Sequence, residues 1–170
     1  MNDEIVFSET QRFKQWWLWA ILIGINVQFL YIFFKQVVGG QPVGDTPMNN
    51  TWLIIVMGLM MLFTISFYFF RLETLISKVG IRVRFFPFHL SSRQYEWSQI
   101  SKCFVREYSA IREYGGWGVR VGLFGKGKAF NVSGNKGLQL EFNDDRKLLI
   151  GTNKPEELSD ALKKLRRYKE

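Results

Sequence analysis

A glycine-rich stretch in the second half of the chain has the spacing of a phosphate-binding loop. It runs from Gly122 to Ala129 and places Gly127 and Lys128 where such a loop carries its last glycine and its lysine. The next residue in such a loop is Ser or Thr, which holds magnesium, and a helix begins there to aim its amide groups at phosphate. Here the next residue is Ala129, and residues 130–133 have an extended pattern. The sequence therefore favours a basic glycine-rich hairpin over a nucleotide site.

Few side chains are suited to nucleophilic, acid–base or metal chemistry. The chain has one cysteine, Cys103, and one histidine, His89, which excludes a disulfide framework or a multi-thiolate metal site within one chain. We expect Cys103 to be a small buried residue in a strand and His89 to be structural or exposed. Asp144 and Asp145 have the composition of a turn. We therefore expect no catalytic residue, no cofactor, no metal and no enzymatic activity.

Basic and aromatic residues interleave around two adjacent glycines at positions 115 and 116. This combination suits a protein-partner or lipid site, because Trp and Arg are frequent anchors at interfaces. It also suits a solvated sheet face whose aromatic residues lie in the core or at its rim, and both interpretations stay open. The candidate binding residues are Arg106, Arg112, Trp117, Arg120, Lys126 and Lys128.

A second basic set, Lys78, Arg82 and Arg84, flanks a predicted turn at residues 79–80. Basic side chains near an anionic leaflet contribute about 1 kcal/mol each to membrane attraction. We assign these three residues to membrane-surface electrostatics in preference to a specific headgroup site.

The elements that position these residues begin with two apolar windows, at residues 16–34 and 52–70. Each has 19 residues and no charged side chain, which is long enough for a helix to cross a hydrocarbon core. Inside lipid an isolated apolar segment must form its own backbone hydrogen bonds, so both windows are predicted to be transmembrane helices. Asn26 and Gln28 are expected to bond to the neighbouring helix. Close-packing positions for that contact are Gly24, Gly58, Thr64 and Ser66.

Basic residues predict the orientation of this hairpin. Two of them precede the first window, four follow the second closely, and the connector at residues 35–51 carries one. By the positive-inside rule, residues 1–15 and 71–170 are cytoplasmic and the connector is external, in a multi-pass protein of the cell membrane. The alternative for the first window, a cleaved signal peptide, is disfavoured because the start is acidic and no small-residue cleavage site follows.

Residues 71–170 change to an alternating pattern. Apolar residues alternate with polar ones in three runs, at 81–85, 119–123 and 138–142, as in strands with one buried face. Glycine- and Asn-rich turns separate the runs, which favours an antiparallel sheet or barrel. With a formal charge of +9 on these 100 residues and +8 on the whole chain, the basic balance fits a cytoplasmic membrane surface better than nucleic acid.

The last segment is the one convincingly helical part of this region. Leu158, Ala161, Leu162 and Leu165 recur at the spacing of one helix face. Pro155 suits the first turn, and Thr152 or Asn153 is a possible cap upstream. The helix is expected to cover an open end or face of the sheet.

The segment at 95–100, the strand ending at 148–152 and the helix opening at 155–158 resemble the bacterial pleckstrin-homology-like (PH-like) domain. The stretches 114–120 and 129–134, after two apolar spans, are similar to those of a group of small bacterial membrane proteins. The resemblance implies a membrane protein of α+β class: a transmembrane hairpin followed by an antiparallel sandwich or barrel of about seven strands with a C-terminal helix. It implies no catalytic activity, because such folds bind lipids, peptides and proteins alike.

The sequence thus predicts a non-enzymatic, membrane-anchored adaptor or scaffold that presents a binding surface to a protein partner at the cytoplasmic face. The alternative is a sensor of anionic lipid or lipid headgroups. The expected partners are the bilayer and a protein, with no nucleic acid and no small-molecule substrate.

Overall fold

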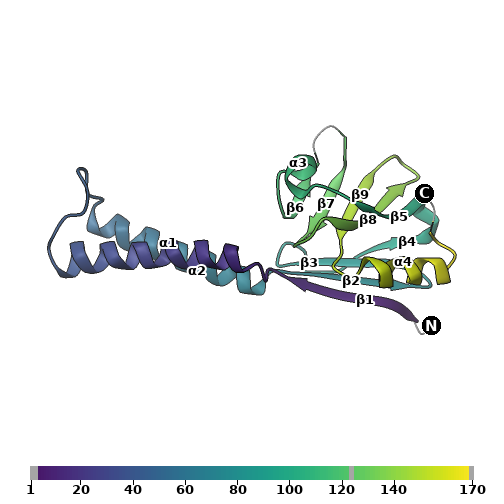
Figure 1. Cartoon of the computed structure of the whole chain (residues 1–170), viewed down its shortest axis with the longest axis horizontal. Helices are drawn as coiled ribbons and strands as arrows, with labels where there is room; N and C mark the ends of the chain where they lie inside the picture. The colour runs from purple at the N-terminus through teal and green to yellow at the C-terminus, as the bar shows by residue number, and fades with distance from the viewer. Residues whose placement is uncertain (1–3, 123–124, 169–170) are drawn as a thin grey trace. The chain divides into compact units, whose positions relative to one another are not determined.

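The chain divides into two compact units in a computed structural model that describes residues 4–122 and 125–168. One unit is residues 14–69. The other combines the segment up to Phe13 with the segment from Phe70 onward. Figure 1 labels the elements of both.

The unit at residues 14–69 is a helical hairpin. Helix α1 (Trp16–Phe33) continues into a π-helical turn η1 (Phe34–Val38), and α2 (Asn50–Phe69) follows the connector. Both helices are long and apolar enough to cross a membrane, as predicted. The connector is held by Gln36, whose Nε2 donates to the Met48 carbonyl and to Asn50 Oδ1.

Hydrogen bonding between the two helices follows the sequence prediction only in part. Asn26 donates from Nδ2 to Thr64 Oγ1 at 2.7 Å, as expected. The two glycines were wrongly assigned to this contact, because a Cβ added at Gly24 or Gly58 would meet nothing within 4 Å. Ser66 donates to the Phe63 carbonyl of its own helix.

The first sheet of the other unit has four antiparallel strands in the order β1–β2–β3–β4. The strands are β1 (Ile5–Arg12), β2 (Arg71–Ser77), β3 (Gly80–Phe86) and β4 (Arg93–Glu96). Sequence analysis assigned no strand to residues 1–15, yet β1 pairs with β2 from Ile5 opposite Ser77 to Arg12 opposite Arg71. The inward face of β1 carries one apolar residue, Phe7, and two polar ones, Glu9 and Gln11. It therefore lacks the apolar alternation that marks a strand in sequence.

The second sheet has five strands in the order β5–β8–β9–β7–β6. Their bounds are β5 (Ile100–Glu107), β6 (Gly118–Val121), β7 (Lys128–Asn131), β8 (Lys136–Phe142) and β9 (Lys147–Gly151). A 3-10 turn η2 (Trp97–Gln99) precedes β5, and the short helix α3 (Ala110–Tyr114) follows it. The pairs are antiparallel except β7 with β9, which run parallel. The expected α+β architecture is confirmed in its coarse form, but with nine described strands in two sheets rather than about seven.

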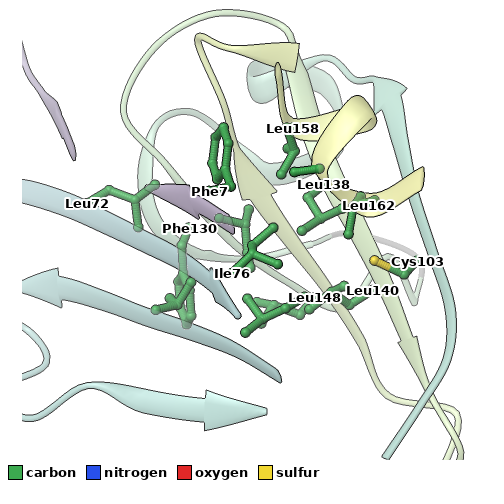
Figure 2. Packing of buried hydrophobic residues seen from close by; sticks show 14 of the residues in the cluster. Phe7, Leu72, Ile76, Cys103, Phe130, Leu138, Leu140, Leu148, Leu158 and Leu162 are labelled. Atoms are coloured by element: carbon green, nitrogen blue, oxygen red, sulfur yellow. The ribbon is translucent and has the colours of Figure 1, made fainter. Parts of the chain in front are cut away.

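The core lies between the two sheets and under the last helix, α4 (Pro155–Lys164). Figure 2 shows Phe7, Leu72 and Ile76 of the first sheet meeting Phe130, Leu138, Leu140 and Leu148 of the second, with Leu158 and Leu162 of α4 against them. The predicted helix and its buried face are confirmed. Its N-cap position is Lys154, whose amide donates to Thr152 Oγ1 at 3.0 Å.

The alternating runs differ in outcome. Ile81, Val83 and Phe85 of β3 are fully buried, as predicted. The prediction for 119–123 was wrong about burial: Val119 is 36% exposed and Val121 is 73% exposed, because β6 is an edge strand. Leu123, the third apolar residue of that run, lies outside the described residues.

Candidate functional site

The stretch with phosphate-loop spacing joins two strands. The β6 strand ends at Val121 and β7 begins at Lys128, so a strand follows the glycines where a phosphate loop requires a helix. Gly127 has φ +79°, and a Cβ there would collide with the backbone of Lys147 at the start of β9. The close approach of the Lys147 backbone therefore explains why residue 127 is a glycine. The hairpin expected from the sequence is confirmed over its described residues.

This hairpin forms one side of an open groove of about 370 Å³. Strand β4 contributes Arg93 and Tyr95, and the β8–β9 turn contributes Asp145 and Arg146. These segments come from both sheets. The groove therefore exists only because the two sheets are packed together.

Apolar side chains form part of the groove wall. The rings of Tyr95 and Phe142 lie 5.2 Å apart, centroid to centroid, and Val121 is 73% exposed. An apolar side chain this accessible loses contact with water when a ligand covers it, at about 25 cal/mol per Å² of apolar surface. The wall thus offers a ligand hydrophobic contact.

Four basic side chains, Arg93, Lys128, Arg146 and Lys147, also line the groove. Two are compensated: Arg146 Nε donates to Asp144 Oδ2 at 2.6 Å, and Lys147 Nζ lies 3.0 Å from Glu141 Oε1. Within residues 4–122 and 125–168, neither Arg93 nor Lys128 has an ion-pair partner. These two cations are available to an acidic ligand.

The charges of Arg93 and Lys128 affect the protonation of His89. Its ring packs edge-on to Phe130 with centroids 4.9 Å apart, and its Nδ1 accepts a hydrogen bond from the Phe85 amide at 3.3 Å. Burial lowers the pKa of His89 below its ordinary 6.5, and the positive charges of Arg93 and Lys128 lower it further. The positive potential of the groove therefore reaches the imidazole. The expected structural role of His89 fits this buried position.

A terminal strand of each sheet contributes to the groove, through Arg93 and Tyr95 of β4 and Val121 at the end of β6. In the sheet orders given above, β4 and β6 are each terminal, and both have mostly exposed residues. An edge strand carries backbone N–H and C=O groups that the sheet leaves unpaired, and an extended polypeptide can pair with them. The groove thus combines residues of two edge strands with an apolar wall and with two cations that have no ion-pair partner among the described residues.

The candidate residues near the two glycines are divided by the structure. Arg106 forms a two-point ion pair with Glu113, through Nη1 at 3.2 Å and Nη2 at 2.9 Å, and also donates to Gln139 and Tyr114. Lys126 Nζ lies 3.8 Å from the same carboxylate. Burial opposes the charged form of Glu113, but hydrogen bonds from Arg106 and the Ser109 amide outweigh it and lower its pKa. Arg106 and Lys126 thus help to hold α3.

The other members of that candidate set lie in different surroundings. Trp117 packs against a small cluster of Tyr108, Ala110, Tyr114, Ala129 and Leu149. Arg120 donates from Nε to the Trp117 carbonyl, and Arg112 lies exposed on α3. Lys128 is the one member that lines the groove.

Of the three basic residues around the β2–β3 turn, Arg82 and Arg84 lie in β3 and Lys78 lies in the turn itself. Lys78 pairs with Glu4, and Arg82 donates from Nε to Gln94 Oε1 at 3.2 Å. Arg84 contacts Glu73 through Nε at 2.8 Å and Nη2 at 2.7 Å. Neighbouring carboxylates thus offset part of the charge of Lys78 and Arg84, and the Gln94 side chain accepts a hydrogen bond from Arg82.

Sequence analysis missed the groove residues Arg93, Tyr95, Phe142, Arg146 and Lys147. One weak signal was present: Arg93 and Tyr95 are two positions apart, which places them on one face of a strand. In the described part of the chain, no three His, Cys, Asp or Glu side chains gather as metal ligands would. No family model, curated protein or solved structure matches the chain.

Proposed function

We propose that the protein is a membrane-anchored, non-enzymatic adaptor whose groove binds an extended acidic segment of a protein partner. The observation that carries this proposal is the position of Arg93 and Lys128, two cations without an ion-pair partner among the described residues, in a groove bordered by two sheet edges. Backbone pairing with β4 or β6 supplies affinity for an extended chain, and the cations select acidic side chains.

Strand pairing supports the proposed membrane topology. Because β1 precedes α1 and β2 follows α2, their pairing requires both to lie on the same side of any membrane that the helices cross. Two crossings meet this requirement. The excess of basic residues beside these two strands makes that side cytoplasmic, with the connector at residues 35–51 external.

The PH-like identity is also part of the proposal. Two packed sheets followed by a helix support it. The parallel β7–β9 pair and the contribution of β1 from before the helical hairpin are additions to the expected antiparallel arrangement. The binding role rests on the groove and not on this likeness.

Site-specific photocrosslinking of the full chain in its native membrane tests the adaptor role. A photoreactive residue replaces Val121 in the groove, and a matched control replaces Ile111, which is 65% exposed on α3. We expect one protein adduct from position 121 that disappears when Arg93→Glu and Lys128→Glu are combined. No adduct, or equal adducts from both positions, would contradict the proposal.

Anionic lipid is the competing ligand for the same two cations. Vesicles of neutral and of anionic composition, each carrying the full chain, separate the two cases. If lipid is the ligand, the mobility of a spin label at position 121 falls in the anionic vesicles alone, without any other protein. That result would contradict the adaptor role and would support the alternative function, a sensor of anionic lipid.

A further inference from the structure

The two carboxamides in the middle of α1, Asn26 and Gln28, differ in their hydrogen bonding. Both N–H groups of the Asn26 carboxamide are used within the hairpin, since Nδ2 donates to the Leu22 carbonyl and to Thr64 Oγ1, both at 2.7 Å. Gln28 is exposed on α1 and makes no hydrogen bond to any residue at 4–122 or 125–168. The two amides therefore serve different contacts, although only one residue separates them.

The depth of Gln28 makes this exposure costly if the helices cross a bilayer as proposed above. It is the thirteenth residue of the apolar stretch Trp16–Val38, which has 23 residues, and thus lies near the middle. A carboxamide has two N–H donors and an acceptor oxygen, and hydrocarbon satisfies neither kind. An unbonded amide in an apolar medium costs several kcal/mol. A partner helix with a polar group at the same depth removes that cost.

The residues around Gln28 form a seam suited to helix packing. Trp17, Ile21, Gly24, Gln28 and Tyr31 follow one another at intervals of four, three, four and three residues, and all five are exposed. This is the heptad spacing of left-handed helix pairs. A Cβ at Gly24 would meet nothing within 4 Å, so another backbone can approach closely there.

We propose that two copies of this chain associate through these five residues of α1, with the two Gln28 carboxamides hydrogen-bonded to each other. A second copy meets the chemical requirement because a two-fold axis places residue 28 opposite residue 28 at the same depth. Each amide then donates to the oxygen of the other. This inference rests on the proposal that α1 and α2 cross the membrane.

The test measures association of the full chain in neutral lipid vesicles by energy transfer between C-terminally labelled copies, over a range of protein-to-lipid ratios. Gln28→Leu is expected to weaken self-association about tenfold, which corresponds to about 1.4 kcal/mol for the loss of the two interhelical hydrogen bonds. Gln28→Asn is expected to restore part of the loss. Gly24→Leu is expected to weaken association by blocking close approach. The matched control is Val27→Leu, because Val27 is exposed outside the seam.

Alkaline carbonate extraction of the same vesicles separates this inference from the proposal beneath it. Release of the wild-type chain would show that the helices do not cross the membrane. That result would contradict the proposed membrane anchoring and the self-association together. A retained wild-type chain that stays monomeric, or that associates equally well as Gln28→Leu, would overturn the self-association alone. Association that depends on Gln28 and Gly24 but not on Val27 would support it.

Discussion

Thr152 donates a hydrogen bond from Oγ1 to Glu9 Oε2 at 2.6 Å, joining two buried residues from opposite ends of the chain. The other carboxylate oxygen of Glu9 accepts from the Asn153 amide at 2.8 Å. Next along β1, Gln11 Nε2 donates to the Gly151 carbonyl at 2.6 Å. The strand before the helical hairpin is thus hydrogen-bonded to the end of β9 and to the loop between β9 and α4. The two-sheet unit is complete only with residues from both sides of the hairpin.

A fragment of residues 71–170 is therefore expected to fold poorly. Removing β1 uncovers Leu72 and Ile76, which are fully buried, and deletes Phe7 from the core. Joining residues 1–13 to residues 70–170 by a short Gly/Ser linker should restore the fold, since Arg12 and Arg71 are paired neighbours. Near-ultraviolet circular dichroism and urea unfolding compare the two chains. Equal, cooperative unfolding would show that β1 is dispensable.

The hydrogen bond from Thr152 can be tested in that linked chain. Thr152→Val keeps the shape of the side chain and removes its hydroxyl, which leaves a buried carboxylate oxygen of Glu9 without this donor and the Lys154 amide without its acceptor. We expect the free energy of unfolding to fall by about 1.5 to 3 kcal/mol, the range for hydrogen bonds to charged groups. Ser133→Ala is the control: its Oγ donates to Asn153 Oδ1 at an exposed site, and its loss should cost less than about 0.5 kcal/mol. Equal losses would argue against a special role for Glu9.

Cys103 should be inert to thiol reagents in the folded protein. It is 2% exposed in β5, and burial raises its pKa to about 12. At pH 8 roughly one thiol in ten thousand is then ionised, and the thiolate is the reactive form. We expect maleimide labelling only in urea, whereas a Cys103→Ala, Ile111→Cys variant should react at once. Rapid labelling of native Cys103 would contradict the buried placement.

The pKa of His89 should report the charge in the groove. After burial, the charges of Arg93 and Lys128 hold this pKa below 6.5. Arg93→Gln with Lys128→Gln is therefore expected to raise it, whereas Arg112→Gln should not. Because the chain has one histidine, nuclear magnetic resonance of the imidazole follows the titration without assignment. An unchanged His89 pKa in the double variant would contradict the claim that the charges of Arg93 and Lys128 lower it.

The same shift predicts how stability changes with pH. The folded pKa of His89 lies below 6.5, so the unfolded chain takes up the proton first as the pH falls. The contribution of His89 to stability is therefore complete above about pH 6.5, and it is lost as the pH falls below that value and through the lower pKa of the folded state. Urea unfolding of the linked chain between pH 5 and 7.5 measures this loss of stability. In the His89→Gln variant the free energy of unfolding should fall less over the same pH range.

Local patterns predicted those elements whose burial depends on their own residues. Ile81, Val83 and Phe85 alternate and are buried, and Leu158 and Leu162 recur at helical spacing and cover the core. Strand β1 escaped prediction because its inward Glu9 and Gln11 are polar, and the groups that satisfy them are about 140 residues away in sequence.

The groove escaped prediction for a related reason. Arg93 and Lys128 belong to different sheets, and no short motif contains both. Arg106 and Glu113 show the opposite error, since a basic residue predicted to face a ligand is held by a carboxylate seven positions later. The sequence shows which surface residues are charged, but it does not show which of them form ion pairs.

The most direct test of the adaptor account is equilibrium binding of an acidic extended peptide to the full chain in discs of neutral lipid. The probe is a labelled ten-residue peptide of alternating Glu and Val, and its Lys and Val counterpart is the control peptide. We predict saturable binding of the acidic probe alone, weakened about tenfold or more by Arg93→Glu with Lys128→Glu and unchanged by Arg112→Glu, which lies exposed outside the groove. Rising salt should weaken it as well. Failure to saturate, or equal weakening by Arg112→Glu, would contradict the account.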